Sequence, residues 1–197
     1  MQAMYDIICS TVIGGVVLSM LMGFNTQIVE EAGAQTVKTM AQTNLTTGTE
    51  IVEFEFRKLG YYVLSRKDSS ILLADSNKIR FAGDIDNDGI VDTLKYEFNA
   101  ALPSGNPNKN THLLYRTLNG GSPQPMNIGL TKFKISYFDS TGGLFTTYPI
   151  TTPSRIRLLK IAMNIESTVP YIPVEEKYVK QNPGVYWERT FKPKNLR

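Results

Sequence analysis

The chain has 197 residues, of which 42% are hydrophobic and 20% are charged, and its formal net charge at pH 7 is +3. That charge is too small, and the basic residues are too scattered, to indicate a nucleic-acid-binding protein. The single cysteine, Cys9, lies in an apolar segment, so the rest of the chain can form neither an internal disulfide nor a cysteine metal site.

An uncharged apolar segment occupies residues 7–24, close to the beginning of the sequence. A segment of about 18 such residues is long enough to cross a bilayer core as a helix. No basic residue precedes it and no small-residue cleavage pattern follows it, so a cleavable signal peptide fits poorly. The first basic residue of the chain is Lys38. The lack of cations directly after the apolar segment favours an exported head and an amino end inside the cell. We therefore predict a transmembrane helix over residues 1–25 of a single-pass membrane protein.

Small residues are frequent in the apolar segment, and they permit close packing of helices in lipid. They are Ser10, Thr11, Gly14, Gly15, Ser19 and Gly23. Two interpretations remain open at this point. The segment is either a simple anchor or an anchor that also packs into an assembly.

After the apolar segment, apolar or small residues recur at steps of four and three, as on one face of a helix. They are Val37, Ala41, Leu45, Gly48, Val52, Phe56, Leu59 and Val63. One helix from Tyr5 to Tyr62 would be roughly 85–90 Å long, far longer than a bilayer is thick. Its polar middle is rich in threonine, so it needs tertiary packing or partner helices. We predict a helical stem over residues 26–64, with its last turns docked on a head domain.

From Ser69 onward the period of the apolar residues changes to two, which is typical of half-buried strands. The apolar members are Ile79 and Phe81; Leu94, Tyr96 and Phe98; Phe133, Ile135 and Tyr137; and Leu159, Ile161, Met163 and Ile165. Residues 113–118 and 185–191 are further candidate strands. Segments rich in glycine, asparagine and proline separate them. We predict an antiparallel meander with one face covered by the stem, which is an α+β fold with a β-rich head over residues 65–197.

The most distinctive local motif is a run of alternating carboxylates, Asp84-Ile-Asp86-Asn-Asp88-Gly89-Ile-Val-Asp92. Calcium takes six to eight oxygen ligands, and this spacing matches the first nine positions of an EF-hand loop. Position 12 of that pattern is Lys95, and the residues around it alternate like a strand. Two interpretations remain open. The four aspartates form a weak calcium site, or they form an acidic turn in which aspartate and glycine serve the turn geometry.

Support for catalysis is weak. The only histidine, His112, stands at the beginning of a predicted strand, with no nucleophile-elbow glycine pattern near it. The aspartates could serve a magnesium phosphotransferase, but the sequence has no phosphate-binding glycine loop with its lysine. We therefore do not expect an enzyme.

The order of these parts resembles that of the minor type IV pilins and the minor pseudopilins of type II secretion, especially the PilW-like and J-type subunits. The matching pieces are Phe56-Arg57-Lys58-Leu59-Gly60-Tyr61, Lys78-Ile79-Arg80-Phe81, the aspartate run, Leu94-Lys95-Tyr96, Leu114-Tyr115-Arg116 and a closing Asn195-Leu196. Together they span almost the whole chain. The resemblance implies a pilin-like fold in which a long amino-terminal helix packs on the head.

The same resemblance implies a structural subunit of a pilus or pseudopilus, held in the inner membrane with its head outside the cytoplasm. Its partners would be other pilin or pseudopilin subunits, reached through the amino-terminal helix, together with the lipid bilayer and secreted cargo. Neither an organic cofactor nor a nucleic-acid partner is implied. Calcium is the one ion that the residues themselves suggest.

The beginning of the chain departs from that family, because it has neither a short basic leader nor the segment Phe-Thr-Leu-Ile-Glu. Either this chain begins after processing or the protein is never processed. Asp6 takes the place of the family's glutamate, which pairs with a neighbour's amino terminus within lipid, or it lies in the headgroup layer. If Asp6 does take the place of that glutamate, Asp6, Gly14 and Gly15 are assembly residues.

Two other classes of function remain. One is a bitopic binding module, in which the helix only anchors a head that captures a ligand and carries a weak calcium site. The other is a membrane-tethered enzyme that uses His112 with Asp84 and Asp86.

Overall fold

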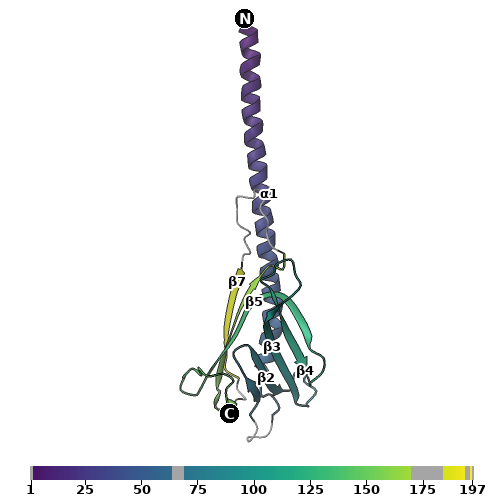
Figure 1. The fold of residues 1–197 in the computed structure, drawn as a ribbon, viewed down its shortest axis with the longest axis vertical. Helices are drawn as coiled ribbons and strands as arrows, with labels where there is room; N and C mark the ends of the chain where they lie inside the picture. Colours follow the sequence, from purple (N-terminus) through teal and green to yellow (C-terminus); the bar gives the residue numbers. More distant parts are fainter. Residues whose placement is uncertain (1, 64–68, 170–183, 194–195, 197) are drawn as a thin grey trace.

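The computed structural model describes the chain except for residues 1, 64–68, 170–183, 194–195 and 197. One long helix, α1 (Gln2–Arg57), leads into an antiparallel sheet of seven strands (Figure 1). The strands are β1 (Ile71–Ala74), β2 (Lys78–Gly83), β3 (Asp92–Pro103), β4 (His112–Leu118), β5 (Gln124–Phe138), β6 (Leu158–Glu166) and β7 (Gly184–Phe191), with a short 3-10 turn, η1 (Pro153–Arg155), before β6. The predicted α+β class is therefore confirmed. Residue 64 of the predicted stem and Asn195 of the closing segment lie outside the described residues.

The sheet is a meander, because each strand pairs with the next one along the chain. It is also curled. The turn between β1 and β2 contacts two more distant strands, since Ile135 donates its backbone N–H to the Ser76 carbonyl at 2.7 Å and Phe98 donates to Asn77 at 2.9 Å. Register shifts within β3, β4 and β5 accompany the curl, as expected because bulges increase local twist.

The predicted inward-facing residues of β2, β3, β5 and β6 are all buried. Two elements were not predicted from the sequence. The strand β1 has only four residues and no alternation, and the first third of β5 contains Pro125, Asn127 and Gly129. The strand β1 is too short to show a period. In the first third of β5 the apolar residues Met126, Ile128 and Leu130 do alternate with Pro125, Asn127 and Gly129, but proline and glycine disfavour a strand.

The predicted end of the helix, Tyr62, is wrong by five residues, because α1 ends at Arg57. Gly60 and Tyr62 have positive φ angles of 77° and 63°, which a helix cannot contain. The turn instead pairs with the end of β2, with Gly60 N–H donating to the Ala82 carbonyl at 2.8 Å. A Cβ on Gly83 would lie 2.2 Å from the Lys58 carbonyl oxygen, so only glycine permits this approach.

The carboxyl-terminal part of α1 docks on the concave side of the sheet (Figure 1). Its buried face contains the predicted residues Val37, Ala41, Gly48, Val52 and Phe56. The Phe56 ring lies 5.1 Å from the Phe81 ring and 5.7 Å from the rings of both Tyr96 and Phe191. These aromatic contacts connect the helix to β2, β3 and β7, and each stabilises by about 0.5–1.5 kcal/mol beyond its buried area.

A buried ion pair lies beside these rings. The Glu55 side chain is almost fully buried. Its Oε1 accepts a hydrogen bond from Arg116 Nε at 2.8 Å and forms an ion pair with Arg116 Nη2 at 2.6 Å. The Tyr96 hydroxyl donates to Oε2. Burial and the Glu55 carboxylate raise the pKa of Tyr96, so the phenol stays protonated as a donor. The hydrogen bond to Glu55 raises the pKa of Arg116. The three side chains satisfy one another and join α1 to β3 and β4.

Replacing one partner of this ion pair should destabilise the fold more than replacing both partners by apolar residues. Glu55→Leu leaves the Arg116 guanidinium without its acceptor and should lower the free energy of unfolding by about 3 kcal/mol. The double variant Glu55→Leu/Arg116→Met should recover part of that loss. We would measure denaturant unfolding of the full chain in detergent micelles by Trp187 fluorescence, with the exposed pair variant Glu97→Gln as control. The single variant Arg116→Met is measured as well. If the losses of unfolding free energy of the two single variants simply add in the double variant, this view is contradicted.

Candidate functional site

The amino-terminal part of α1 projects away from the head (Figure 1). No residue between Gln2 and Thr36 is buried, and Val37 is the first buried residue of the helix. These 35 residues correspond to about 52 Å of helix. An 18-residue window of α1 has a mean hydropathy of 2.2 and is not buried at all. Within the described part of the chain, α1 is therefore the one helix long and apolar enough to cross a membrane.

A ridge of small side chains runs along this projecting helix at steps of four residues: Thr11, Gly15, Ser19 and Gly23. The hydroxyls do not require outside partners, because Thr11 Oγ1 donates to the Ile7 carbonyl and Ser19 Oγ donates to the Gly15 carbonyl, each at 3.0 Å. A Cβ built on Gly15 would meet nothing within 4 Å. The ridge is a smooth surface that another helix can approach closely in lipid.

The three predicted assembly residues do not share one face of the helix. Gly15 follows Asp6 by nine residues, which is about two and a half turns, so it lies on the opposite side of the helix. Gly14 lies about 80° around the axis from Asp6. The Asp6 side chain is exposed in the second turn, at the amino end of the apolar segment. One partner helix can therefore contact either Asp6 or the small ridge, and contacts to both require two partners.

A second uncovered surface continues beyond the length of a membrane span. Val29, Met40, Ile51 and Phe54 are between 38% and 58% exposed, and we call them the outer flank. Their spacing of 11, 11 and 3 residues places them on one side of α1, about a third of a turn from the face that docks on the head. This surface was not predicted from the sequence, although the spacing of 11 residues is visible there.

The aspartate run forms the turn between β2 and β3, and Asp84 organises it. The Asp84 side chain is buried, and its Oδ1 accepts the backbone N–H groups of Asn87 at 2.7 Å and Asp88 at 3.2 Å. Its Oδ2 accepts the N–H of Gly89 at 3.0 Å. Asn87 and Gly89 have positive φ angles of 66° and 85°, as a tight turn requires.

Three of the four predicted calcium ligands lie together. Asp84, Asp86 and Asp88 can each contribute one oxygen to a group whose members lie within 4.8 Å of one another. Asp92 instead closes the base of the turn, accepting hydrogen bonds from Ile85 N–H at 3.0 Å and from Asn119 Nδ2 at 2.7 Å. Three carboxylates are a suitable nucleus for a hard cation, whose remaining ligands would be carbonyl oxygens or water.

His112 is far from the aspartate turn. It pairs with Pro103 at one end of β3, while Asp92 begins the other end, so roughly 35 Å of strand separates them. Its Nδ1 lies 3.0 Å from the Leu102 carbonyl oxygen, and its ring packs edge-on against Phe98. The residues that the tethered-enzyme hypothesis needs are therefore not brought into one site.

Comparison with known proteins adds no family to these observations. No protein-family model matches the chain, and no curated protein matches its sequence.

Removing the Asp84 carboxylate should destabilise the head through the turn itself. Asp84→Ala removes the buried carboxylate that accepts the N–H groups of Asn87 and Gly89 and one of the two acceptors of the Asp88 N–H, which should lower the free energy of unfolding by about 1–3 kcal/mol. The matched variant Asp86→Ala affects an exposed side chain with one long hydrogen bond of 3.2 Å and should cost less than about 1 kcal/mol. Denaturant unfolding of both variants tests this, and equal losses would show that Asp84 has no special role.

Proposed function

We propose that this protein is a structural subunit of a type IV pilus or of a secretion pseudopilus, anchored in the inner membrane with its head outside the cytoplasm. The observation that carries the proposal is the stretch of α1 over residues 2–29, in which every residue is exposed. Apolar helix surface of this extent must be covered by lipid or by other chains, because its exposure to water is costly.

A bilayer accounts for only part of that stretch. About 20 residues suffice to cross the hydrocarbon core, and they correspond to the apolar segment at residues 7–24. Residues 25–36 then form about 18 Å of helix before the first buried residue, Val37, and residues 25–29 of this interval are all exposed. Ile28 and Val29 are more than half exposed there. A simple anchor needs no such interval, whereas neighbouring stems in an assembly would cover it and continue onto the outer flank.

The small ridge and Asp6 fit the same proposal. Small residues at steps of four permit close helix contacts within lipid, where there is no hydrophobic driving force between helices. A carboxylate at the membrane end of the helix is costly without a partner, and a neighbour's amino terminus would supply one. Because Asp6 and Gly15 lie on opposite sides of α1, the subunit would contact neighbours on both sides, as a subunit inside a fibre does.

The pieces that resemble pilins also contact one another in the head. Tyr96 and Arg116, from two of the matching strand motifs, both bind Glu55 of the stem. The turn that contains Gly60 pairs with the end of β2, directly before the aspartate turn. Motifs that are distant in the sequence thus form one structural unit, which supports the resemblance as a whole.

Assembly should depend on the small side chains of the apolar segment. Gly14→Leu/Gly15→Leu adds bulk without reducing hydropathy, so insertion in the membrane should be unchanged while helix packing is blocked. We expect the fraction of the protein in sheared surface fibres or extracted secretion complexes to fall at least about five-fold. Asp6→Ala should reduce incorporation as well.

The matched control is Leu18→Ile, which preserves volume in the same segment. Membrane content is measured in parallel by immunoblotting. Normal incorporation of the double glycine variant at normal membrane content would overturn the proposal and favour a bitopic binding module.

We also propose that the aspartate turn binds calcium weakly, because three carboxylates offer ligand atoms within 4.8 Å of one another. A calcium concentration of about 10 mM exceeds the dissociation constants of weak extracellular calcium sites. Binding to the folded state should therefore raise the melting temperature by a few degrees. Asp86→Asn/Asp88→Asn keeps the turn acceptors, removes both charges and should abolish the shift. No shift in the parent protein, or an equal shift in the variant, would exclude this site.

A further inference from the structure

The turn between β4 and β5 contains the one Asn-Gly dipeptide of the chain, Asn119-Gly120. Both residues have positive φ angles, 50° and 69°, and Gly121 N–H donates to the Leu118 carbonyl at 2.9 Å, which closes a tight two-residue turn. Both residues are exposed. A Cβ built on Gly120 would meet nothing within 4 Å, so the peptide group after Asn119 is accessible. No group in the described part of the chain accepts the Gly120 N–H.

The Asn119 side chain joins this turn to the beginning of β3. Its Oδ1 accepts the Thr93 N–H at 2.8 Å, and its Nδ2 donates to Asp92 Oδ1 at 2.7 Å. The Asn119 backbone N–H donates to the Thr93 carbonyl, also at 2.8 Å. The bond to Asp92 is charge-assisted, and Asp92 is buried. The side-chain amide is therefore fixed at both its oxygen and its nitrogen. We call these bonds the Asn119 contact.

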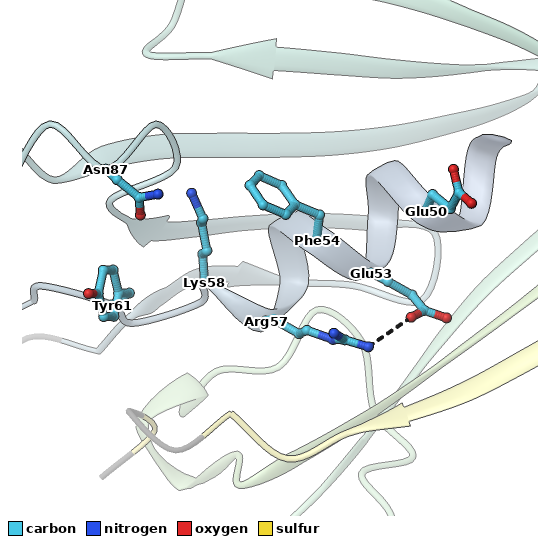
Figure 2. A pocket seen from close by; sticks show the side chains of 7 residues that line it. All are labelled: Glu50, Glu53, Phe54, Arg57, Lys58, Tyr61 and Asn87. Atoms are coloured by element: carbon cyan, nitrogen blue, oxygen red, sulfur yellow. Dashed lines mark hydrogen bonds and ion pairs between the residues drawn. The ribbon is translucent and has the colours of Figure 1, made fainter.

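Asp92 connects the Asn119 contact to the aspartate turn, because its Oδ2 accepts the Ile85 N–H at 3.0 Å. On another side the same turn is held by α1, where Lys58 Nζ donates to the Ile85 carbonyl. Figure 2 shows the Lys58 side chain extending toward the segment that carries Asn87, and both residues line a pocket of about 510 Å³ at the end of α1. The aspartate turn is thus supported by α1 through Lys58 and by the β4–β5 turn through Asn119.

An Asn-Gly pair can lose ammonia without an enzyme. The Gly120 backbone nitrogen attacks Cγ of Asn119, so that an N–C bond forms and the Cγ–Nδ2 bond breaks. Ammonia leaves with the proton of the Gly120 N–H. Water then opens the resulting imide ring at either of its carbonyls, which gives aspartate or isoaspartate. Glycine permits the attack because it has no side chain to shield its nitrogen, and the reaction needs only water.

We propose that Asn119 is a deamidation site that the fold keeps closed and that local opening of the Asn119 contact releases. In the five-membered imide ring, the Asn119 side chain folds back onto its own backbone. The hydrogen bonds to Asp92 and Thr93 instead extend this side chain toward β3. Ring closure therefore requires both bonds to break, and the charge-assisted bond to Asp92 opposes this more strongly. Each molecule in which the contact opens can thus acquire a permanent chemical change.

The product cannot restore the contact. A carboxylate at position 119 has no N–H donor to replace Nδ2 opposite Asp92. It also brings a second negative charge to a place where the two side chains were 2.7 Å apart, and like charges at this distance repel. The aspartate turn would then lose the support that it receives through Asn119. This inference depends on neither the assembly proposal nor the calcium proposal.

The test follows deamidation of the full chain in detergent micelles at mildly alkaline pH, by mass spectrometry of the tryptic peptide over residues 117–132. The same peptide contains an internal reference, Asn127, which precedes Ile128 and exchanges two hydrogen bonds with Asn106. We expect Asn119 to deamidate at least about ten-fold faster in denaturant than in the folded protein. In denaturant, Asn127 should react more slowly than Asn119, because the Ile128 side chain shields the attacking nitrogen.

Three variants distinguish local opening of the Asn119 contact from global unfolding. Asp92→Ala removes the acceptor of Nδ2 and should accelerate deamidation of the folded chain by about five-fold or more. Asp92→Asn keeps an acceptor oxygen and should accelerate it less. Ile135→Val is the matched control, because it destabilises the buried core at β5 without altering the contact, and its effect should stay within about two-fold. Melting temperatures verify that each variant folds.

Asn119→Asp reproduces one product and should lower the melting temperature by a few degrees. Asn127→Asp, for which no carboxylate is a partner, should lower it less. Equal deamidation rates in the folded and unfolded protein would overturn the inference, and so would an acceleration by Asp92→Ala no greater than that by Ile135→Val. A melting temperature of Asn119→Asp equal to that of the parent would overturn the claim that the product cannot restore the contact. None of these results would affect the assembly proposal, which is tested in the host.

Discussion

The constraint on which the rest of this structure depends is the mismatch between a long helix and a small head. The helix has 56 residues, and its first buried residue is Val37. The head buries residues of the helix only from Val37 onward, and residues 2–29 are all exposed. Helices in proteins gain most of their stability from tertiary packing, and isolated helices are marginal in water. A single molecule thus leaves this helix surface uncovered, and in the assembly proposal lipid and neighbouring helices would cover it.

The docked part of the helix is attached by interactions of different kinds that meet at one place. Phe56 supplies apolar contact, Glu55 supplies a buried ion pair with Arg116, and Gly83 permits the next turn to pair with β2. A force applied to the stem would thus reach β2, β3 and β4 through short-range contacts. The same junction places the aspartate turn and the pocket side by side, since Lys58 bonds to Ile85 and Asn87 forms part of the pocket wall.

The sequence predicted those elements whose apolar residues repeat clearly. The alternating residues of β2, β3, β5 and β6 are buried as expected, because period alone decides which face turns inward. The stripe from Val37 to Phe56 is buried as well, except that its Leu45 is only partly covered. It could not predict the helix end, which depends on the approach of Gly83 to Lys58, nor β1, which is too short to show a period. The aspartate turn was located correctly, but the separate role of Asp92 arises from its hydrogen bond to Asn119, a residue 27 positions away.

The most direct test of the assembly proposal uses Cys9, the only cysteine of the chain, which is exposed on the projecting helix. A thiol-reactive photo-crosslinker attached to Cys9 in host membranes, followed by mass spectrometry of the adducts, would identify what covers this part of α1. We expect adducts with the apolar helix of another copy or of another envelope protein. Adducts with lipid alone, under conditions in which fibres or secretion complexes are present, would contradict the proposal that this helix packs among other subunits.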